Sequence, residues 1–282
     1  MVGQYAPEST IKDLSINRFE NENPPIFHYT KMETFSKIIA NQSFRFTDYR
    51  YLNDTQEFVW GIKQLKNTLE NLRGKTAKLI LDNLGTLNKV ELYVASFSLE
   101  PDLLSQWRAY GDDGKGVSFG VNPIAMLKAF GASFFHGKVV YDSKKQTKRI
   151  KRVVTASFEY FEKKVMTIKD VESIVRYLSL IIATYKHQSF IEEREYRLFV
   201  ISDTPQRPYW LEAGLNSERK PYYCIKTADL PIQEFLPIEK IFIGPSSDFY
   251  SSEIFVRKLF EANKYEFNSS KIIKSKIPYR IV

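Results

Sequence analysis

The sequence predicts an α+β fold with one central, largely antiparallel or split β-sheet, flanking helices and a helical insertion. Short apolar runs favour strands, and longer stretches with apolar residues at helical spacing favour helices. The two kinds of segment alternate irregularly and without a repeat, which is typical of this fold class. No linker-like stretch divides the chain. We therefore expect residues 1–23 to form a loosely packed arm and residues 24–282 to form a single domain.

In the first part of the chain, a short strand at 26–29 follows Pro24-Pro25. Thr30, with Glu33 three residues later, predicts the N-cap of a helix. The remaining segments predicted before residue 122 are a strand at 44–46, a helix that opens in the polar turn 51–57, a helical stretch near 76–90, a strand at 92–98, a loop or short helix at 99–110 with Trp107, a glycine turn at 111–116 and a strand at 117–121.

Pro123 can begin the next helix, because proline is favoured in the first helical turn. We then expect a strand at 138–141 and two helical segments over 146–190, parted near Asp170. A strand from Glu193 to Val200 follows. Later strands are expected at 222–225 and 238–244, with a closing helix at 247–263.

The composition excludes several classes of protein. With 43% hydrophobic and 15% aromatic residues in 282, the chain can bury a sizeable core. One cysteine, Cys224, rules out an internal disulfide and a cysteine-based metal cluster. No apolar run reaches the ~20 residues of a membrane helix. A polar segment follows Met1, so we expect a cytoplasmic protein without a membrane partner. Three histidines without an HExxH pattern exclude a typical zinc hydrolase, and we expect no metal.

The formal net charge of +8 favours anionic partners such as nucleotides, nucleic acid or acidic proteins. Much of the excess lies in residues 144–152 and in the tail from Lys271 onward. Solvated helix faces and loops account for these charges. A nucleic-acid surface is the alternative, although no aromatic side chains are regularly interleaved with them.

The segment from Glu193 to Val200 begins with charges and ends in an apolar run. Residues two apart on a strand share a face, so we expect Glu193 and Glu195 to stand side by side. Neighbouring carboxylates repel, and one of them then holds its proton more tightly. Either nearby cations compensate the repulsion between the two carboxylates, or the pair has a chemical role.

Other polar groups have an ordinary structural explanation beside a functional one. His28-Tyr29-Thr30 ends a buried strand, and Ser96 and Ser98 share one strand face. The turn before Gly116 can bring its backbone close to a ligand, or it can be a plain turn. Asn53, Asp54 and Glu57 can bind a divalent cation, but a helix-capping turn explains them better.

The order of these motifs resembles a bacterial family of domains of unknown function, number 2971. The resemblance rests on His28-Tyr29-Thr30, Phe44-Arg45-Phe46, Leu52-Asn53-Asp54 with Glu57, Ser96-Phe97-Ser98, Trp107 with Tyr110, Gly116 to Gly120, and Glu193 to Arg197. It spans roughly residues 25 to 245.

More remotely, the chain resembles ADP-ribosyltransferases of the diphtheria-toxin and poly-ADP-ribose-polymerase type. Their histidine motif is similar to His28-Tyr29-Thr30, their glycine-basic-glycine turn to Gly114–Phe119, and their glutamate before a tyrosine to Glu195-Tyr196. Ser118 stands where the polymerase-like branch has a tyrosine that stacks on nicotinamide. Tyr110, Tyr29 or Trp107 can supply that ring instead.

The resemblance implies an ADP-ribosyltransferase-like fold and NAD as substrate, with no metal. Glu195 would stabilise the positive charge that develops on the ribose, and Glu193 would orient it or activate the acceptor. His28 would hold a ribose hydroxyl, and the Tyr29 backbone would hold the nicotinamide amide. By the same resemblance, the NAD-binding residues are His28, Tyr29, Thr30, Arg45, Ser96, Ser98, Tyr110, Gly116 and Ser118.

We therefore expect ADP-ribosyl transfer from NAD to a nucleic-acid or protein acceptor, or NAD hydrolysis, in a toxin or phage-defence effector. The alternative is a non-catalytic nucleic-acid or protein interaction module in which Glu193 and Glu195 pair with Lys186, Arg194 or Arg197. A third hypothesis is 2′-phosphate transfer on RNA, which normally requires several basic residues around the phosphate.

Overall fold

A computed structural model describes the chain as an α+β protein. It covers residues 24–52, 55–130, 134–161, 166–201, 209–213, 218–226, 235–266, 268 and 271–279. The expected N-terminal arm, and Asn53 and Asp54 of the possible cation site, lie outside the described residues. None of the helices in the described part is long and apolar enough to span a bilayer.

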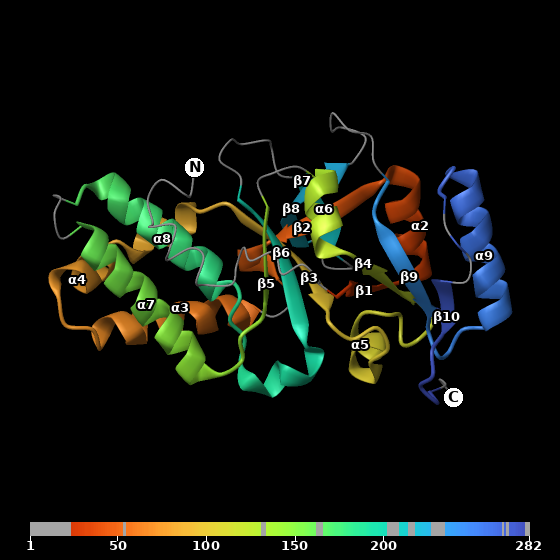
Figure 1. Cartoon of the computed structure of the whole chain (residues 1–282), viewed down its shortest axis with the longest axis horizontal. Helices are drawn as coiled ribbons and strands as arrows, with labels where there is room; N and C mark the ends of the chain where they lie inside the picture. Colours follow the sequence, from red (N-terminus) through yellow and green to blue (C-terminus); the bar gives the residue numbers. More distant parts are fainter. Residues whose placement is uncertain are drawn as a thin grey trace.

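The elements follow one another along the chain as listed here (Figure 1). They are β1 (Ile26–Thr30), α2 (Met32–Asn41), β2 (Ser43–Asp48), η2 (Tyr49–Tyr51), α3 (Thr55–Glu70), α4 (Lys75–Asp82), η3 (Leu84–Lys89), β3 (Leu92–Ser98), α5 (Leu104–Ala109), β4 (Val117–Val121), α6 (Pro123–Phe130), β5 (Phe134–Lys138), α7 (Ser143–Phe161), α8 (Ile168–Ile182), η4 (Gln188–Glu193), β6 (Glu195–Ile201), β7 (Tyr209–Ala213), β8 (Glu218–Lys226), β9 (Ile238–Ile243), α9 (Phe249–Ala262) and β10 (Ile272–Lys274).

The described strands form one mixed, mostly antiparallel sheet, and β3 lies at its centre. One edge of β3 pairs along its whole length with β6. The other edge is divided: Ser98 pairs with Phe27 of β1, whereas Tyr93 and Val94 pair with β2. β1 and β2 therefore lie along the same edge of β3, one at each end of it. The mostly antiparallel pairing confirms the sequence-based prediction. The pair β9–β10 is parallel.

Two hydrophobic cores lie on opposite faces of the central strands. On one face, α3, α4, α7 and α8 gather as the helical insertion, and Val94 and Phe199 pack against them. On the other face, α2 and α9 cover β1, β4 and β9, and Phe97 and Leu198 face this second core (Figure 1). Apart from the exposed Ser96, the residues of β3 are buried on both faces, and Glu195 to Val200 of β6 are buried as well, which explains the apolar runs in these strands.

Some of the sequence-based boundaries are wrong. Thr30 does not cap α2: it is the last residue of β1 and pairs with Val117, so Lys31 is the N-cap and uses no side-chain hydrogen bond. The strand expected at 138–141 lies earlier, because β5 ends at Lys138. Beyond it, Val140 forms only an isolated parallel bridge to Tyr185. The short strands β7 and β10 were not expected from the sequence.

The glycine turn before β4 is held by the protein's own backbone. The N–H of Gly114 donates to the carbonyls of Trp107 and Gly111, and a Cβ on Gly116 would lie 2.1 Å from the carbonyl oxygen of Thr30. The close approach that requires glycine at position 116 is therefore an approach between two chain segments.

We expect Gly116→Ala to destabilise the protein by roughly 1–3 kcal/mol, because the new methyl group overlaps a backbone atom that cannot move independently. Gly85→Ala is the matched control, since a Cβ there meets no atom within 4 Å. Urea unfolding of both variants checks this. Equal stability of the two would contradict the close packing at Gly116.

Candidate functional site

A pocket of about 520 Å³ opens where β1 and β2 meet the same edge of β3. This volume lies within the range of small-molecule sites. Its walls come from β1, β2, β3, α5 and the segment that leads into β6. The lining residues are Phe27, His28, Tyr29, Phe44, Arg45, Thr47, Leu52, Val94, Ala95, Ser96, Phe97, Ser98, Gln106, Tyr110, Lys186, Phe190, Glu193, Glu195 and Arg197.

The buried carboxylate of Glu195 is held by a guanidinium two residues away on the same strand face. The Nε of Arg197 lies 2.7 Å from Oε1, and its Nη2 lies 2.9 Å from Oε2. The Nη1 of the same guanidinium donates to the carbonyl oxygen of Ala183 at 2.6 Å. Arg197 is 1% exposed, and Glu195 is 7% exposed. This bidentate arrangement fixes the orientation of the carboxylate.

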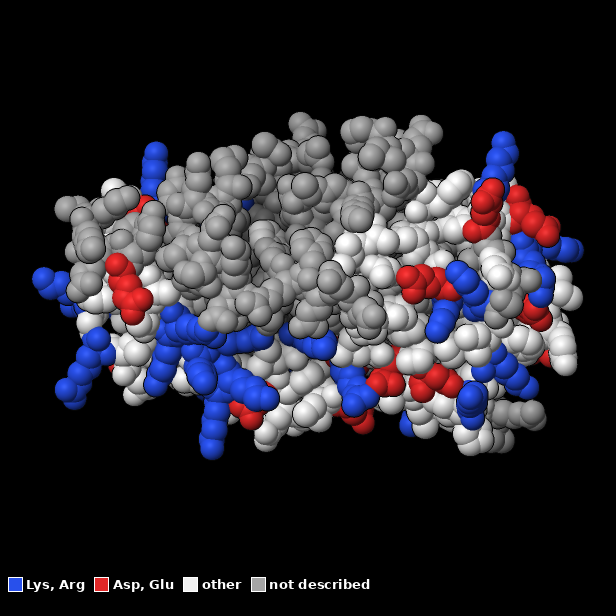
Figure 2. Space-filling view, in the orientation of Figure 1, with Lys and Arg blue, Asp and Glu red and all other residues white. Residues whose placement is uncertain are grey.

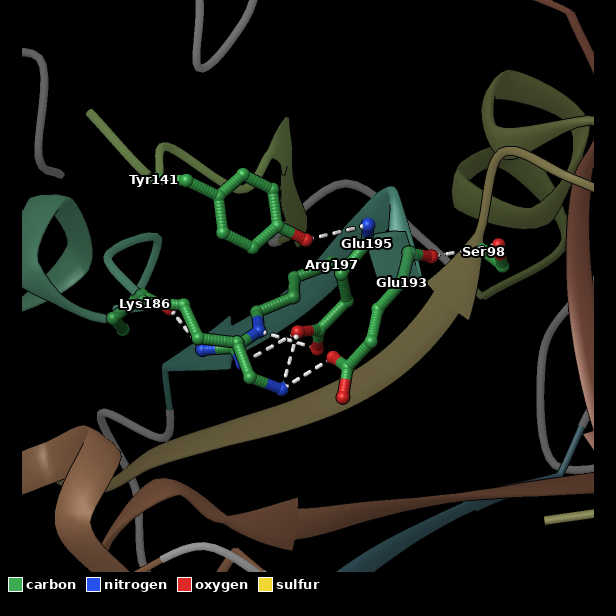
Figure 3. Close-up of polar contacts among 7 residues, drawn as sticks. Ser98, Tyr141, Lys186, Glu193, Glu195 and Arg197 are labelled. Carbon is green, nitrogen blue, oxygen red and sulfur yellow. Dashed lines mark hydrogen bonds and ion pairs between the residues drawn. The ribbon is translucent and has the colours of Figure 1, made fainter. Parts of the chain in front are cut away.

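Lys186 joins the two glutamates (Figure 3). Its Nζ lies 2.5 Å from Oε2 of Glu193 and 3.3 Å from Oε2 of Glu195. We call these two glutamates, together with Lys186 and Arg197, the charged cluster. Its two positive charges balance its two negative charges. The Nζ also lies 4.9 Å from the centroid of the Phe190 ring.

The glutamates meet for a different reason from the one expected. Glu193 is the last residue of η4, and the strand begins only at Glu195, so strand alternation does not align them. Arg194 between them has a left-handed backbone, with φ of 47°. The Ser98 hydroxyl donates to the Glu193 carbonyl at 2.8 Å and fixes this turn. Arg194 pairs with Glu100 outside the cluster.

The backbone around the cluster is anchored by buried polar side chains. The Nε2 of Gln146 donates to the carbonyl oxygens of Val140 and Lys186 at 2.6 and 3.0 Å. The N–H of Glu195 donates to the hydroxyl oxygen of Tyr141 at 2.9 Å. These bonds connect the start of α7 to the charged cluster.

The charged cluster keeps Glu195 ionised. Burial would raise the pKa of this carboxyl, but the charges of Arg197 and Lys186, with hydrogen bonds from Arg197 and Ser96, outweigh it and lower the pKa from 4.5 to about 2. The expectation that repulsion raises the pKa of one glutamate does not apply to Glu195, because the charges of Arg197 and Lys186 lower its pKa.

This shift predicts a pH dependence of stability. A lowered pKa in the folded state gives a contribution that is complete above the unfolded value near 4.5 and is lost as the pH falls towards about 2. We expect the difference in unfolding free energy between the wild type and Glu195→Gln to shrink over that window. Urea titrations at several pH values measure it; a difference that stays constant below pH 4.5 would contradict the shift.

His28 lies among the rings of Phe44, Phe97 and Phe119, with centroids 4.9, 5.5 and 5.5 Å away. Burial lowers its pKa to about 4, even though the hydrogen bond to Ser96 opposes the change. The ring is therefore neutral near pH 7. Because the Ser96 carbonyl oxygen, 3.1 Å from Nδ1, can only accept, the proton is on Nδ1 and Nε2 is an acceptor.

His28 and Glu195 line the same pocket from different faces of the sheet. Phe27 pairs with Ser98, and Ser98 pairs with Glu195, so these three residues share one face. Neighbouring strand residues alternate, which places His28 on the opposite face with Phe97. The gap between β1 and β2 connects the two faces, so a ligand that contacts both residues must enter that gap.

The other expected NAD-binding residues divide into two groups. Arg45, Ser96, Ser98, Tyr110 and Tyr29 line the pocket, whereas Thr30, Gly116 and Ser118 do not. The Tyr29 hydroxyl donates to the Glu100 carbonyl and accepts from the N–H of Leu103, so this end of the side chain is engaged in structure. The Arg45 guanidinium lies 4.8 Å from the centroid of the Tyr222 ring.

Sequence reasoning did not identify several pocket residues. Gln106, Phe44, Phe97 and Phe190 line the cavity, and the Phe44 and Phe97 rings stack at 5.4 Å. The alternation of Phe44-Arg45-Phe46 indicated a buried ring but not a cavity. Among the described residues, no three His, Cys, Asp or Glu side chains are close enough together to hold a metal ion.

Residues 106–198 match the model of a family described as a protein of unknown function (DUF2971). The matched stretch is shorter than the expected 25 to 245. It contains Lys186, Glu193, Glu195 and Arg197, the whole charged cluster, but begins after the strands β1, β2 and β3 that carry most of the other walls. No curated protein and no solved structure matches the chain.

Proposed function

We propose that the pocket binds NAD and that the protein transfers ADP-ribose from it to a macromolecule, or to water. The observation that carries the proposal is an ionised carboxylate, Glu195, held in fixed orientation in a pocket that also contains a neutral histidine. Breaking the nicotinamide–ribose bond develops positive charge on the ribose, as glycoside cleavage does. A pre-oriented carboxylate beside the ribose stabilises that charge.

The donors already around Glu195 indicate where a ribose hydroxyl would bind. Arg197 occupies both carboxylate oxygens at short distances, whereas Lys186 lies 3.3 Å away. A ribose hydroxyl would displace this longest contact and leave Lys186 on Glu193. The His28 Nε2 would accept a second hydroxyl proton across the gap. The Arg45 guanidinium, on the β2 wall, would bind the pyrophosphate.

The alternative is a non-catalytic interaction module on the same fold. It is favoured by the balance of the charged cluster, because two cations satisfy two carboxylates without a ligand. On this hypothesis, Glu195 has a structural role, and the pocket binds no NAD.

The test is to incubate the protein with NAD and measure both binding and release of nicotinamide. The proposal expects NAD to raise the unfolding temperature and nicotinamide to accumulate. We expect His28→Ala to weaken NAD binding by roughly tenfold, the value of about one hydrogen bond. Thr30→Ala is the control beside it, because Thr30 is outside the pocket lining. Absence of NAD binding by the wild type would overturn the proposed substrate.

A further inference from the structure

The first half of α7 is strongly basic. Over the ten residues from Ser143 to Arg152 it carries six basic residues and no acidic one, and the first acidic residue in the helix is Glu159. The six are Lys144, Lys145, Lys148, Arg149, Lys151 and Arg152. Like charges at i, i+4 spacing, such as Lys144 and Lys148, repel one another on a helix surface, and an anion bound there would relieve this repulsion.

The spacing arranges these charges in two neighbouring columns. Lys144, Lys148 and Lys151 follow the i, i+4, i+7 pattern of one helix face, and the other three residues follow the same pattern one residue later. All three lysines are exposed. The opposite face of α7 is fixed in the helical core, since Ile150 and Val153 are at most 1% exposed. Figure 2 shows the Lys and Arg side chains gathered over the N-terminal end of α7.

The helix that carries this basic surface is attached to the wall of the pocket through its buried face. Gln146, in the second turn of α7, donates to the carbonyl oxygen of Lys186, and Tyr141, just before the helix, accepts from the N–H of Glu195. Both Lys186 and Glu195 line the pocket. An anion on α7 that is long enough to extend past the first turn of the helix would therefore come near the charged cluster.

A nucleic-acid backbone fits this surface best. The residues from Lys144 to Arg152 span about 12 Å, and a duplex carries one negative charge per roughly 1.7 Å of its axis. A membrane-surface helix needs an apolar face for the bilayer, but that face of α7 is buried inside the protein. The surface offers charge without aromatic rings, so it would contact phosphates without reading sequence.

We propose that the basic face of α7 docks the phosphate backbone of a nucleic acid, and that this nucleic acid is the acceptor at the pocket. The docking stands on the geometry of α7 alone. The acceptor assignment rests on the proposed function.

The test measures fluorescence anisotropy of a labelled DNA duplex and an RNA of matched length over a series of salt concentrations. We expect the triple variant Lys144→Gln, Lys148→Gln, Lys151→Gln to bind at least about tenfold more weakly, with a salt slope less negative by about 2–3 for the duplex, because each phosphate contact contributes about 0.9. The control is Lys240→Gln, Lys258→Gln, Lys271→Gln, which removes the same charge from exposed positions around β9, α9 and β10.

Equal weakening by the two triple variants would show that net charge alone attracts the probe and would overturn the docking surface. The docking surface would also be overturned if the protein bound vesicles of anionic phospholipid but bound neither the DNA nor the RNA. Adding radiolabelled NAD to the complex of protein and nucleic acid tests whether the bound nucleic acid is the acceptor. Docking without NAD turnover overturns the proposed function but leaves the docking surface, whereas NAD turnover without labelled nucleic acid overturns only the acceptor.

Discussion

Arg197→Met is expected to lower the free energy of unfolding by roughly 3–5 kcal/mol, because it removes one partner of a buried ion pair. The guanidinium is 1% exposed and donates to both oxygens of Glu195 and to the Ala183 carbonyl. After the substitution, the carboxylate keeps only the long contact to Lys186 among the cations of the cluster, and the end of α8 loses a donor. Methionine fills similar volume, so the loss is mainly electrostatic.

Arg194→Met is the matched control, three residues away on the same segment. Its guanidinium pairs with Glu100, but the side chain is 61% exposed, and exposed ion pairs contribute about 1 kcal/mol or less. Urea unfolding at neutral pH compares the two variants. If Arg197→Met loses no more stability than Arg194→Met, the cluster does not hold the end of α8 to the sheet.

The elements that the sequence predicts well are those whose signal is local. The strand expected at 92–98 is β3 with the same bounds, because an apolar run buried on both faces leaves little choice. Pro123 begins α6 as expected. The errors arise where pairing with a segment distant in the sequence determines whether a residue belongs to a strand. Thr30 extends β1 because Val117 is available to pair with it, and β10 exists because β9 offers an edge.

In the site, too, some residues have a local sequence signal and others are brought together by distant segments. Glu195 stood out because of its neighbouring carboxylate, His28 because it ends a buried strand, and Ser96 because it shares a strand face with Ser98. All three line the pocket. The convergence of Lys186 with Glu193 and Glu195 has no such local signal. It depends on η4, on the left-handed Arg194 and on the Ser98 hydroxyl, a residue 95 positions away from the Glu193 that it binds. The two glutamates do come together at Lys186, but the strand alternation that the sequence spacing suggested is not the reason.

Glu195→Gln is expected to reduce the rate of nicotinamide release by about 100-fold or more, if the proposed function holds. The substitution keeps the shape of the side chain but removes the negative charge that would face the developing ribose cation. Loss of one pre-oriented electrostatic group at a transition state typically costs about 10²–10³ in kcat. KM for NAD would change little, since the ground-state ribose carries no such charge.

Glu193→Gln separates the roles of the two carboxylates. Glu193 contacts Lys186, and it would act on the acceptor. We expect this variant to lose transfer to a macromolecule more than hydrolysis of NAD, whereas Glu195→Gln loses both. Glu195→Asp is a second variant, in case Glu195→Gln does not fold. It keeps the negative charge that pairs with Arg197 and Lys186, but its shorter side chain withdraws the carboxylate from the pocket. Unchanged nicotinamide release in a folded, NAD-binding Glu195→Gln protein would exclude Glu195 as a catalytic residue and favour the interaction module, in which the charged cluster joins α8 to the sheet.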